Sequence, residues 1–82
     1  MKEDNKNIEF LKAIGRRIRH FRNKNKLSQE KFSFECNLHR TYIGAIERGE
    51  KNITITNLKK ISDTLQISII DLFNFDDNNE ES

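Results

Sequence analysis

Apolar residues recur at helical spacing along most of the chain. Between residues 8 and 25, Leu11, Ile14, Ile18 and Phe21 follow one another every three or four positions, as on the buried face of a helix. Four shorter segments predict further helices at residues 28–36, 40–48, 54–65 and 69–73, the last with a possible extension to 75. The chain contains no proline. We therefore expect an all-α, compact five-helix domain.

Polar residues flank these segments where helices are expected to begin and end. Ser28, Thr54 and Ser68 directly precede apolar-periodic runs, and a hydroxyl there accepts a backbone N–H of the first helical turn. Asn37 lies where the chain must turn, and asparagine tolerates the left-handed conformation that ends a helix. Gly49 is expected to end the following helix. Residues 28–49 thus predict a helix, a tight turn and a second helix.

The second of these helices has an unusual outer face. If Ile43 and Ile46 point inward, six residues point away from the core: Arg40, Thr41, Tyr42, Gly44, Ala45 and Arg48. A helix that enters the major groove of DNA needs hydrogen-bonding side chains at its start and small residues further along. On this pattern alone, an ordinary amphipathic surface helix is an equally good interpretation.

The charge is distributed unevenly. Residues 11–31 contain eight Lys or Arg and one Glu, whereas residues 61–82 contain six acidic residues and no Lys or Arg. A polyanion would be attracted to the first region and repelled by the second. The alternative is that the two ends are simply solvated or attract each other.

Other classes of function have little support. The single cysteine cannot form an internal disulfide, and Cys36, His20 and His39 lack the spacing of a metal site. We expect neither a cofactor nor enzymatic activity. The sequence shows no membrane span and no signal peptide, so we expect a reduced, cytoplasmic setting.

Residues 14–73 resemble the lambda-repressor-like helix-turn-helix family of DNA-binding domains. The family pattern L-[ST]-Q-E-x-L-A reads L-S-Q-E-K-F-S here, and R-x-x-[IV]-x-x-[IL]-E-x-G reads R-T-Y-I-G-A-I-E-R-G. Within that family, N-L-H-R-T-Y-I-G-A-I-E-R and N-I-T-I-T-N-L are most similar to the controller proteins of restriction–modification systems. The resemblance implies a double-stranded DNA operator as partner. It also implies a partly buried ion pair between Arg22 and Glu47, which would join the first helix to the third.

Two sets of residues are candidates for DNA contact. For base readout we name Arg40, Thr41, Tyr42 and Ala45, because arginine can bind guanine through two hydrogen bonds and a small methyl group can meet thymine. For the DNA backbone we name Ser28, Gln29, His39, Arg48, Lys51 and Asn52. Tyr42 could instead pack inside the protein, and His39 could cap its own helix.

Several apolar residues predict packing or association. We expect Phe34 to fold back onto the first helix rather than to lie under DNA, and Ile53 and Ile55 to enter the core. The C-terminal set predicts a homodimer interface: Ile67, Ile69, Ile70, Leu72, Phe73 and Phe75. The rival interpretation is an intramolecular cap masked by the acidic tail.

The predicted organisation is a flexible segment 1–7, a DNA-binding and dimerisation domain 8–75, and a disordered tail 76–82. The resemblance implies autoregulation of the protein's own gene and the endonuclease gene. Two dimers bound to one operator are a candidate further assembly, and RNA polymerase is a candidate further partner. A phage or plasmid repressor is the alternative within this class. A protein-interaction module that does not bind DNA is the alternative of another class.

Overall fold

The computed structural model describes residues 5–76, and this part of the chain contains five helices. They are α1 (Asn5–Lys24), α2 (Gln29–Cys36), α3 (Arg40–Glu47), α4 (Ile55–Leu65) and α5 (Ile69–Phe73). This is the predicted all-α architecture. Helix α1 begins at Asn5 rather than at the predicted Ile8, so residues 5–7 are helical. The predicted tail lies outside the described residues from 77 onward.

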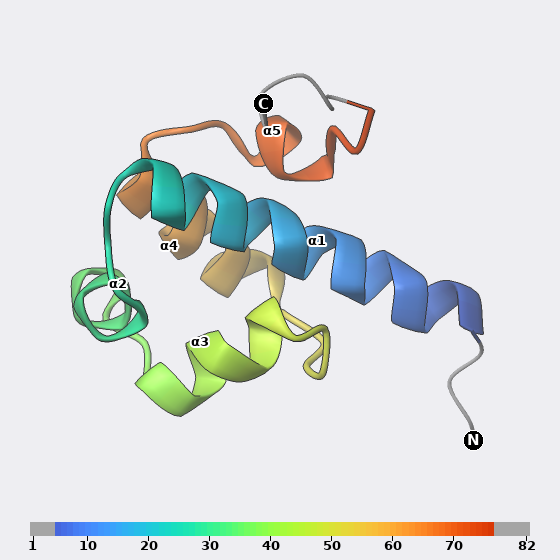
Figure 1. Ribbon diagram of the computed structural model, residues 1–82, viewed down its shortest axis with the longest axis horizontal. Coiled ribbons are helices and arrows are strands. Elements are labelled where there is room, and N and C mark those ends of the chain that lie inside the picture. The colour runs from blue at the N-terminus through green and yellow to red at the C-terminus, as the bar shows by residue number, and fades with distance from the viewer. Residues whose placement is uncertain (1–4, 77–82) are drawn as a thin grey trace.

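Helix α1 is the longest element, and α3, α4 and α5 pack against it. Figure 1 shows α3 below it, α5 above it and α4 behind it, with α2 at the far end of α4 and α3. Helix α2 contacts α3 and α4. This arrangement holds α2 and α3 together as a unit and leaves α5 on the opposite side of α1.

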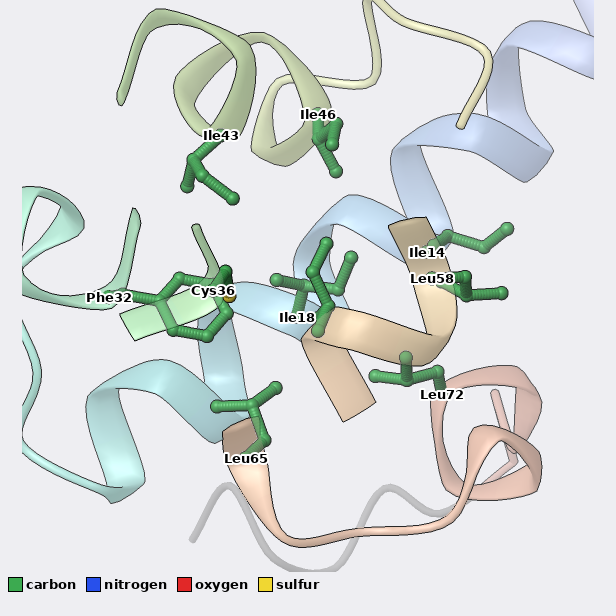
Figure 2. Close-up of a cluster of buried hydrophobic side chains, with 10 residues drawn as sticks. Ile14, Ile18, Phe32, Cys36, Ile43, Ile46, Leu58, Leu65 and Leu72 are labelled. Carbon is green, nitrogen blue, oxygen red and sulfur yellow. The ribbon is translucent and has the colours of Figure 1, made fainter. Parts of the chain in front are cut away.

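The core lies where these helices meet. Of the α1 residues that the apolar spacing places inward, Ile14 and Ile18 lie in the core, Phe21 packs against it, and Leu11 is half-buried outside it. Figure 2 shows Ile18 between Cys36 of α2 and Leu58 of α4. The buried cluster consists of Ile14, Ile18, Phe32, Cys36, Ile43, Ile46, Leu58, Ile61, Leu65 and Leu72. Every helix contributes at least one side chain to it, and α3 packs mainly against α1 and α2.

Two glycines allow α1 to approach the end of α3 closely. A Cβ on Gly15 would lie 2.5 Å from the carbonyl oxygen of Ile46 and 2.6 Å from that of Glu47. A Cβ on Gly49 would lie 2.8 Å from the Cα of Lys12, and Gly49 has a φ of +76°. Because backbone atoms cannot move aside as a flexible side chain can, both positions require glycine.

The predicted helix caps are present. Ser28, Thr54 and Ser68 each accept a backbone N–H in the first turn of the helix that follows, and Ser68 forms a capping box with Asp71. Asn37 adopts the left-handed conformation at the end of α2. Local sequence therefore determines both ends of α2.

Three packing predictions are wrong. Phe34 does not fold onto α1, because its side chain lies on the outer face of α2 and is 81% exposed. Ile55 is 71% exposed at the first position of α4, whereas Ile53 packs against the core as predicted. Leu72 is fully buried inside its own chain, so it has no surface to offer a partner.

The remaining C-terminal apolar residues divide into two groups. Ile67 and Ile69 are half-buried and pack against the core, whereas Ile70, Phe73 and Phe75 are exposed. The ring of Phe10 from α1 lies 6.1 Å from that of Phe73 and 5.9 Å from that of Phe75. We call the surface formed by Phe10, Ile70, Phe73 and Phe75 the C-terminal apolar patch.

Candidate nucleic-acid interface

The helix-turn-helix has short arms and a tight turn. Helices α2 and α3 have eight residues each, and Asn37 and Leu38 form the turn between them. His39 caps α3, since its Nδ1 accepts the backbone N–H of Thr41 at 3.1 Å. The cap fixes where α3 starts, so the first side chains of α3 have a defined direction.

An ion pair joins α1 to α3, as the resemblance implied. Arg22 donates from Nε to Glu47 Oε2 at 2.6 Å and from Nη2 to Oε1 at 2.9 Å, and both side chains are nearly fully buried. The third donor of Arg22, Nη1, binds the carbonyl oxygen of Leu27 at 2.8 Å. A bidentate pair of this kind fixes orientation as well as distance.

Gln29 extends this ion pair to α2. Its Nε2 donates to Glu47 Oε1 at 3.0 Å, so the carboxylate receives hydrogen bonds from α1 and α2 while it belongs to α3. Gln29 was predicted to contact the DNA backbone, and its amide nitrogen is engaged within the protein. The sequence did not indicate this bond, because Gln29 and Glu47 are distant in the chain.

Arg40 and Thr41 are exposed at the start of α3. Arg40 Nη1 lies 3.8 Å from Glu30 Oε1 of α2, and both side chains are mostly exposed. A contact this long between solvated groups holds the side chain only weakly. Both side chains are therefore accessible to solvent at the start of α3.

The middle of α3 is more covered than predicted. Ala45 is only 7% exposed and Gly44 is buried. Gly44 lies under two polar side chains, because a Cβ there would be 3.3 Å from Arg48 Nη1 and 3.6 Å from Gln29 Oε1. Ala45 therefore has little surface to offer a thymine methyl in this conformation.

Arg48 is held by a neighbouring carboxylate. Its Nε lies 3.0 Å from Glu50 Oε2, and both side chains are more than half exposed. The hydrogen bond from Arg48 lowers the pKa of Glu50, and the same bond raises the pKa of Arg48. Both groups are therefore charged around neutral pH.

Tyr42 links α3 to α4. It is half-buried against the core, and its hydroxyl oxygen accepts from Asn57 Nδ2 at 3.0 Å. This bond uses the oxygen as an acceptor and leaves the hydroxyl hydrogen to donate to another group. The predicted packing role is thus present, and a phosphate contact through the O–H remains compatible with it.

The other predicted backbone residues lie around this helix. Ser28 caps α2 and accepts the N–H of Lys31 at 3.0 Å. His39, Lys51 and Asn52 are exposed. The N–H groups in the first turn of a helix lack intrahelical partners and favour an anion.

Arg17 is a structural residue that the sequence analysis missed. It is buried, its Nη2 and Nε donate to the carbonyl oxygen of Asp71 at 2.7 and 3.1 Å, and its guanidinium lies over the ring of Phe21. The signal was in the apolar period, because Arg17 shares a helix face with Ile14, Ile18 and Phe21. Its charge, by contrast, favours a solvent-exposed position.

Other kinds of site find no support in the described part of the chain. Residues 5–76 contain no group of three or more His, Cys, Asp or Glu that could hold a metal ion. Among the same residues, no helix has the length and apolar character needed to cross a membrane.

Comparison with known proteins identifies the same unit. A family model described as helix-turn-helix matches residues 18–72. Control protein C.BamHI of Bacillus amyloliquefaciens is 47% identical over 70 residues, which cover 84% of each chain. The crystal structure of the restriction-modification controller protein C.AhdI from Aeromonas hydrophila matches with a TM-score of 0.75 and 38% identity, over 77% of this chain and 96% of that one.

A third similar structure contains DNA. It is the restriction-modification controller protein C.Esp1396I as a tetramer in complex with its natural 35 base-pair operator. The match has a TM-score of 0.71 and 34% identity, over 78% of this chain and 84% of that chain.

Proposed function

Because the chain belongs to the helix-turn-helix family, and within it to the restriction–modification controller proteins, we propose that it binds one duplex operator as a homodimer. It is a DNA-binding transcription regulator of that family. The finer proposal is autoregulation: the dimer binds beside its own promoter and controls its own gene and the endonuclease gene. RNA polymerase is the partner through which activation would act.

The start of α3 is the observation that carries the proposal. Arg40 and Thr41 are exposed there, and the buried Arg22–Glu47 pair orients the helix behind them. In a helix-turn-helix, the first residues of the second helix reach base edges in the major groove. We assign base readout to Arg40 and Thr41, with Tyr42 donating to a phosphate.

The residues around α3 supply the backbone contacts in this proposal. Ser28 and His39 lie at the first turns of α2 and α3, while Arg48, Lys51 and Asn52 lie at the end of α3 and in the loop that follows. Contacts to phosphate fix the register of the protein on the duplex but carry no base information. Substitution of the two classes therefore has different consequences.

The C-terminal apolar patch supports the homodimer. Its four side chains come from α1, α5 and the residue after Asn74, and Ile70 is 77% exposed. Contiguous exposed apolar residues on a small domain usually mark an interface. A two-fold dimer would present two copies of α3 to successive major grooves, about 34 Å apart.

The test is a selection from random duplexes followed by footprinting and titration. We expect Arg40→Ala to lose roughly 1–3 kcal/mol of discrimination at one base position. Lys51→Ala should weaken binding to all duplexes alike and reduce the salt slope by about one. Lys59→Ala, which removes an exposed lysine of α4, is the control. If neither variant changes DNA affinity, α3 is not the docking face.

A further inference from the structure

Glu50 places a negative charge inside the surface that the proposed function assigns to DNA. Its carboxylate Oε2 lies 3.0 Å from Arg48 Nε. Phosphate is an anion and would compete for the same guanidinium. A DNA-binding surface gains affinity from cations and loses it from such a carboxylate, so the position of Glu50 requires a reason.

The backbone fixes Glu50 in this place. The N–H of Glu50 donates to the carbonyl oxygen of Ala45 at 2.9 Å, and the N–H of Gly49 donates to that of Ile46 at 3.0 Å. With Gly49 in the left-handed region, these two bonds form a Schellman motif at the end of α3. The carboxylate is therefore presented by an ordered turn rather than by a flexible loop.

The other side of Arg48 is equally defined. The guanidinium lies across Gly44, since Arg48 Nη1 is 3.3 Å from the position of a Cβ there, and Gln29 Oε1 is 3.6 Å from the same point. Side chains on a helix lean toward its N-terminus, which directs Arg48 back over the outer face of α3. Glu50 thus holds a guanidinium that lies over Gly44, which is four residues after Arg40 on the same helix.

We propose that Glu50 is a specificity-determining residue that keeps Arg48 from binding phosphate indiscriminately. This inference rests on the proposed function. In the free protein, Glu50 occupies Arg48, and any phosphate must replace it. On the operator, the base contacts of α3 offset the loss of this ion pair. On other DNA no base contacts offset this loss. Glu50 therefore lowers the affinity for non-specific DNA more than the affinity for the operator.

Glu50→Gln tests this directly, because it removes the charge and keeps the shape. The probes are a duplex that the wild-type protein selects from a random pool and a shuffled duplex of equal length and composition. We expect Glu50→Gln to bind the shuffled duplex roughly two- to fivefold more tightly, the range typical of an exposed ion pair. Its salt slope on that duplex should steepen by up to about one. Affinity for the selected duplex should change less.

Two further variants make the result specific. Asp63→Asn is the matched control, because it also removes one acidic charge and one exposed ion pair, that of Lys59 on α4. In the double variant Arg48→Ala/Glu50→Gln, the gain in affinity for the shuffled duplex should disappear. The guanidinium that Glu50→Gln frees is then absent. Thermal unfolding of each variant confirms that the fold is intact.

The outcomes separate the two proposals. If the wild-type protein binds the selected duplex but Glu50→Gln gains nothing on the shuffled one, the inference is overturned and the proposed function stands. A gain that Asp63→Asn matches, or that persists without Arg48, reduces the effect to net charge and also overturns it. If the wild-type protein selects no duplex at all, the proposed function fails first.

Discussion

Glu47 is the residue through which the three helices of the DNA-binding unit are connected. It belongs to α3, and its two oxygens accept from Arg22 of α1 and Gln29 of α2. A buried carboxylate with three hydrogen bonds is satisfied, but each partner is satisfied only while the others are present. Glu47 therefore links α3 to both α1 and α2, in addition to the apolar packing of Ile43 and Ile46.

Removal of Glu47 should be costly. Glu47→Ala leaves the Arg22 guanidinium buried without its counter-ion, and we expect a loss of ~3–5 kcal/mol in the free energy of unfolding. Urea denaturation measures it. Because the variant could unfold, Glu47→Gln provides a milder second case, and Glu35→Ala on the exposed side of α2 is the control. A melting temperature of Glu47→Ala equal to that of the wild type would reduce this pair to an incidental contact.

The buried thiol of Cys36 predicts that the stability of the fold decreases at alkaline pH. Burial raises the pKa of its thiol, against a smaller lowering by a hydrogen bond with Thr64. A raised pKa means that the folded state holds the proton more tightly than the unfolded state. The contribution to stability is complete below the unfolded pKa, about 8.5, and is lost as the pH rises through the folded value.

Denaturation at increasing alkaline pH checks this prediction. Wild type should lose stability more steeply above about pH 8.5 than Cys36→Ala, which has no thiol to ionise. Equal slopes for the two proteins would show that the thiol does not contribute.

At the scale of the helices, the chain ends four of them in the same way. Lys26, Asn37, Gly49 and Gln66 follow α1 to α4 with φ values of 60°, 61°, 76° and 60°. In each case the next N–H bonds back across the turn, as in Leu27 to Arg22 and Ile67 to Ser62. This is the Schellman motif, which prefers glycine, and only one of the four positions has it.

Gln66 is therefore a position at which glycine should stabilise the protein. Gln66→Gly should stabilise the protein by up to about 1 kcal/mol, because a side chain in the left-handed region costs roughly that amount more than glycine. Its side chain is exposed, so nothing else is lost. Gln66→Ala is the control and should not stabilise. Denaturation midpoints measure the stability of both variants. A gain in stability in the alanine variant would mean that backbone conformation is not the cause.

The helices and their ends were predictable from local sequence, whereas the burial of individual side chains was not. The caps at Ser28, Thr54 and Ser68 and the turn at Asn37 depend on interactions within a few residues, and the sequence predicted them. Phe34 and Ala45 show the opposite case. Helical spacing states which side of a helix a residue occupies, but burial depends on which neighbour covers that side, and this is determined by the whole fold.

The candidate site divides in the same way. Exposed Arg40 and Thr41 follow from the start of α3 and the direction of its first turn. The Arg22–Glu47 pair needed the family resemblance, because the two residues are distant in sequence. The bonds from Gln29 to Glu47 and from Asn57 to Tyr42 depend on side chains from different elements. No spacing rule of a single helix contains them.

At the scale of the whole molecule, α1 separates two surfaces. One side carries α3, and the other carries α5, which Figure 1 shows on the opposite side of α1. Arg17 fixes α5 to α1 by its two bonds to the carbonyl oxygen of Asp71. The C-terminal apolar patch therefore has a defined position relative to α3, and self-association through it would set the distance between two recognition helices.

Ile70→Lys tests that arrangement at the most exposed residue of the patch. A buried lysine without a partner opposes association, and Ile70 has little to do within its own chain because it is 77% exposed. We expect a folded monomer in sedimentation. Its affinity for the selected duplex should fall by roughly a hundredfold or more, since two linked sites gain that much from binding together.

Phe34→Lys is the matched control, because Phe34 is a still more exposed apolar residue on α2. It should remain dimeric. If Phe34→Lys yields the monomer and Ile70→Lys does not, the molecules associate through α2, and the C-terminal apolar patch is not the dimer interface. The oligomeric state of this one pair of variants thus decides between two geometries of the operator complex.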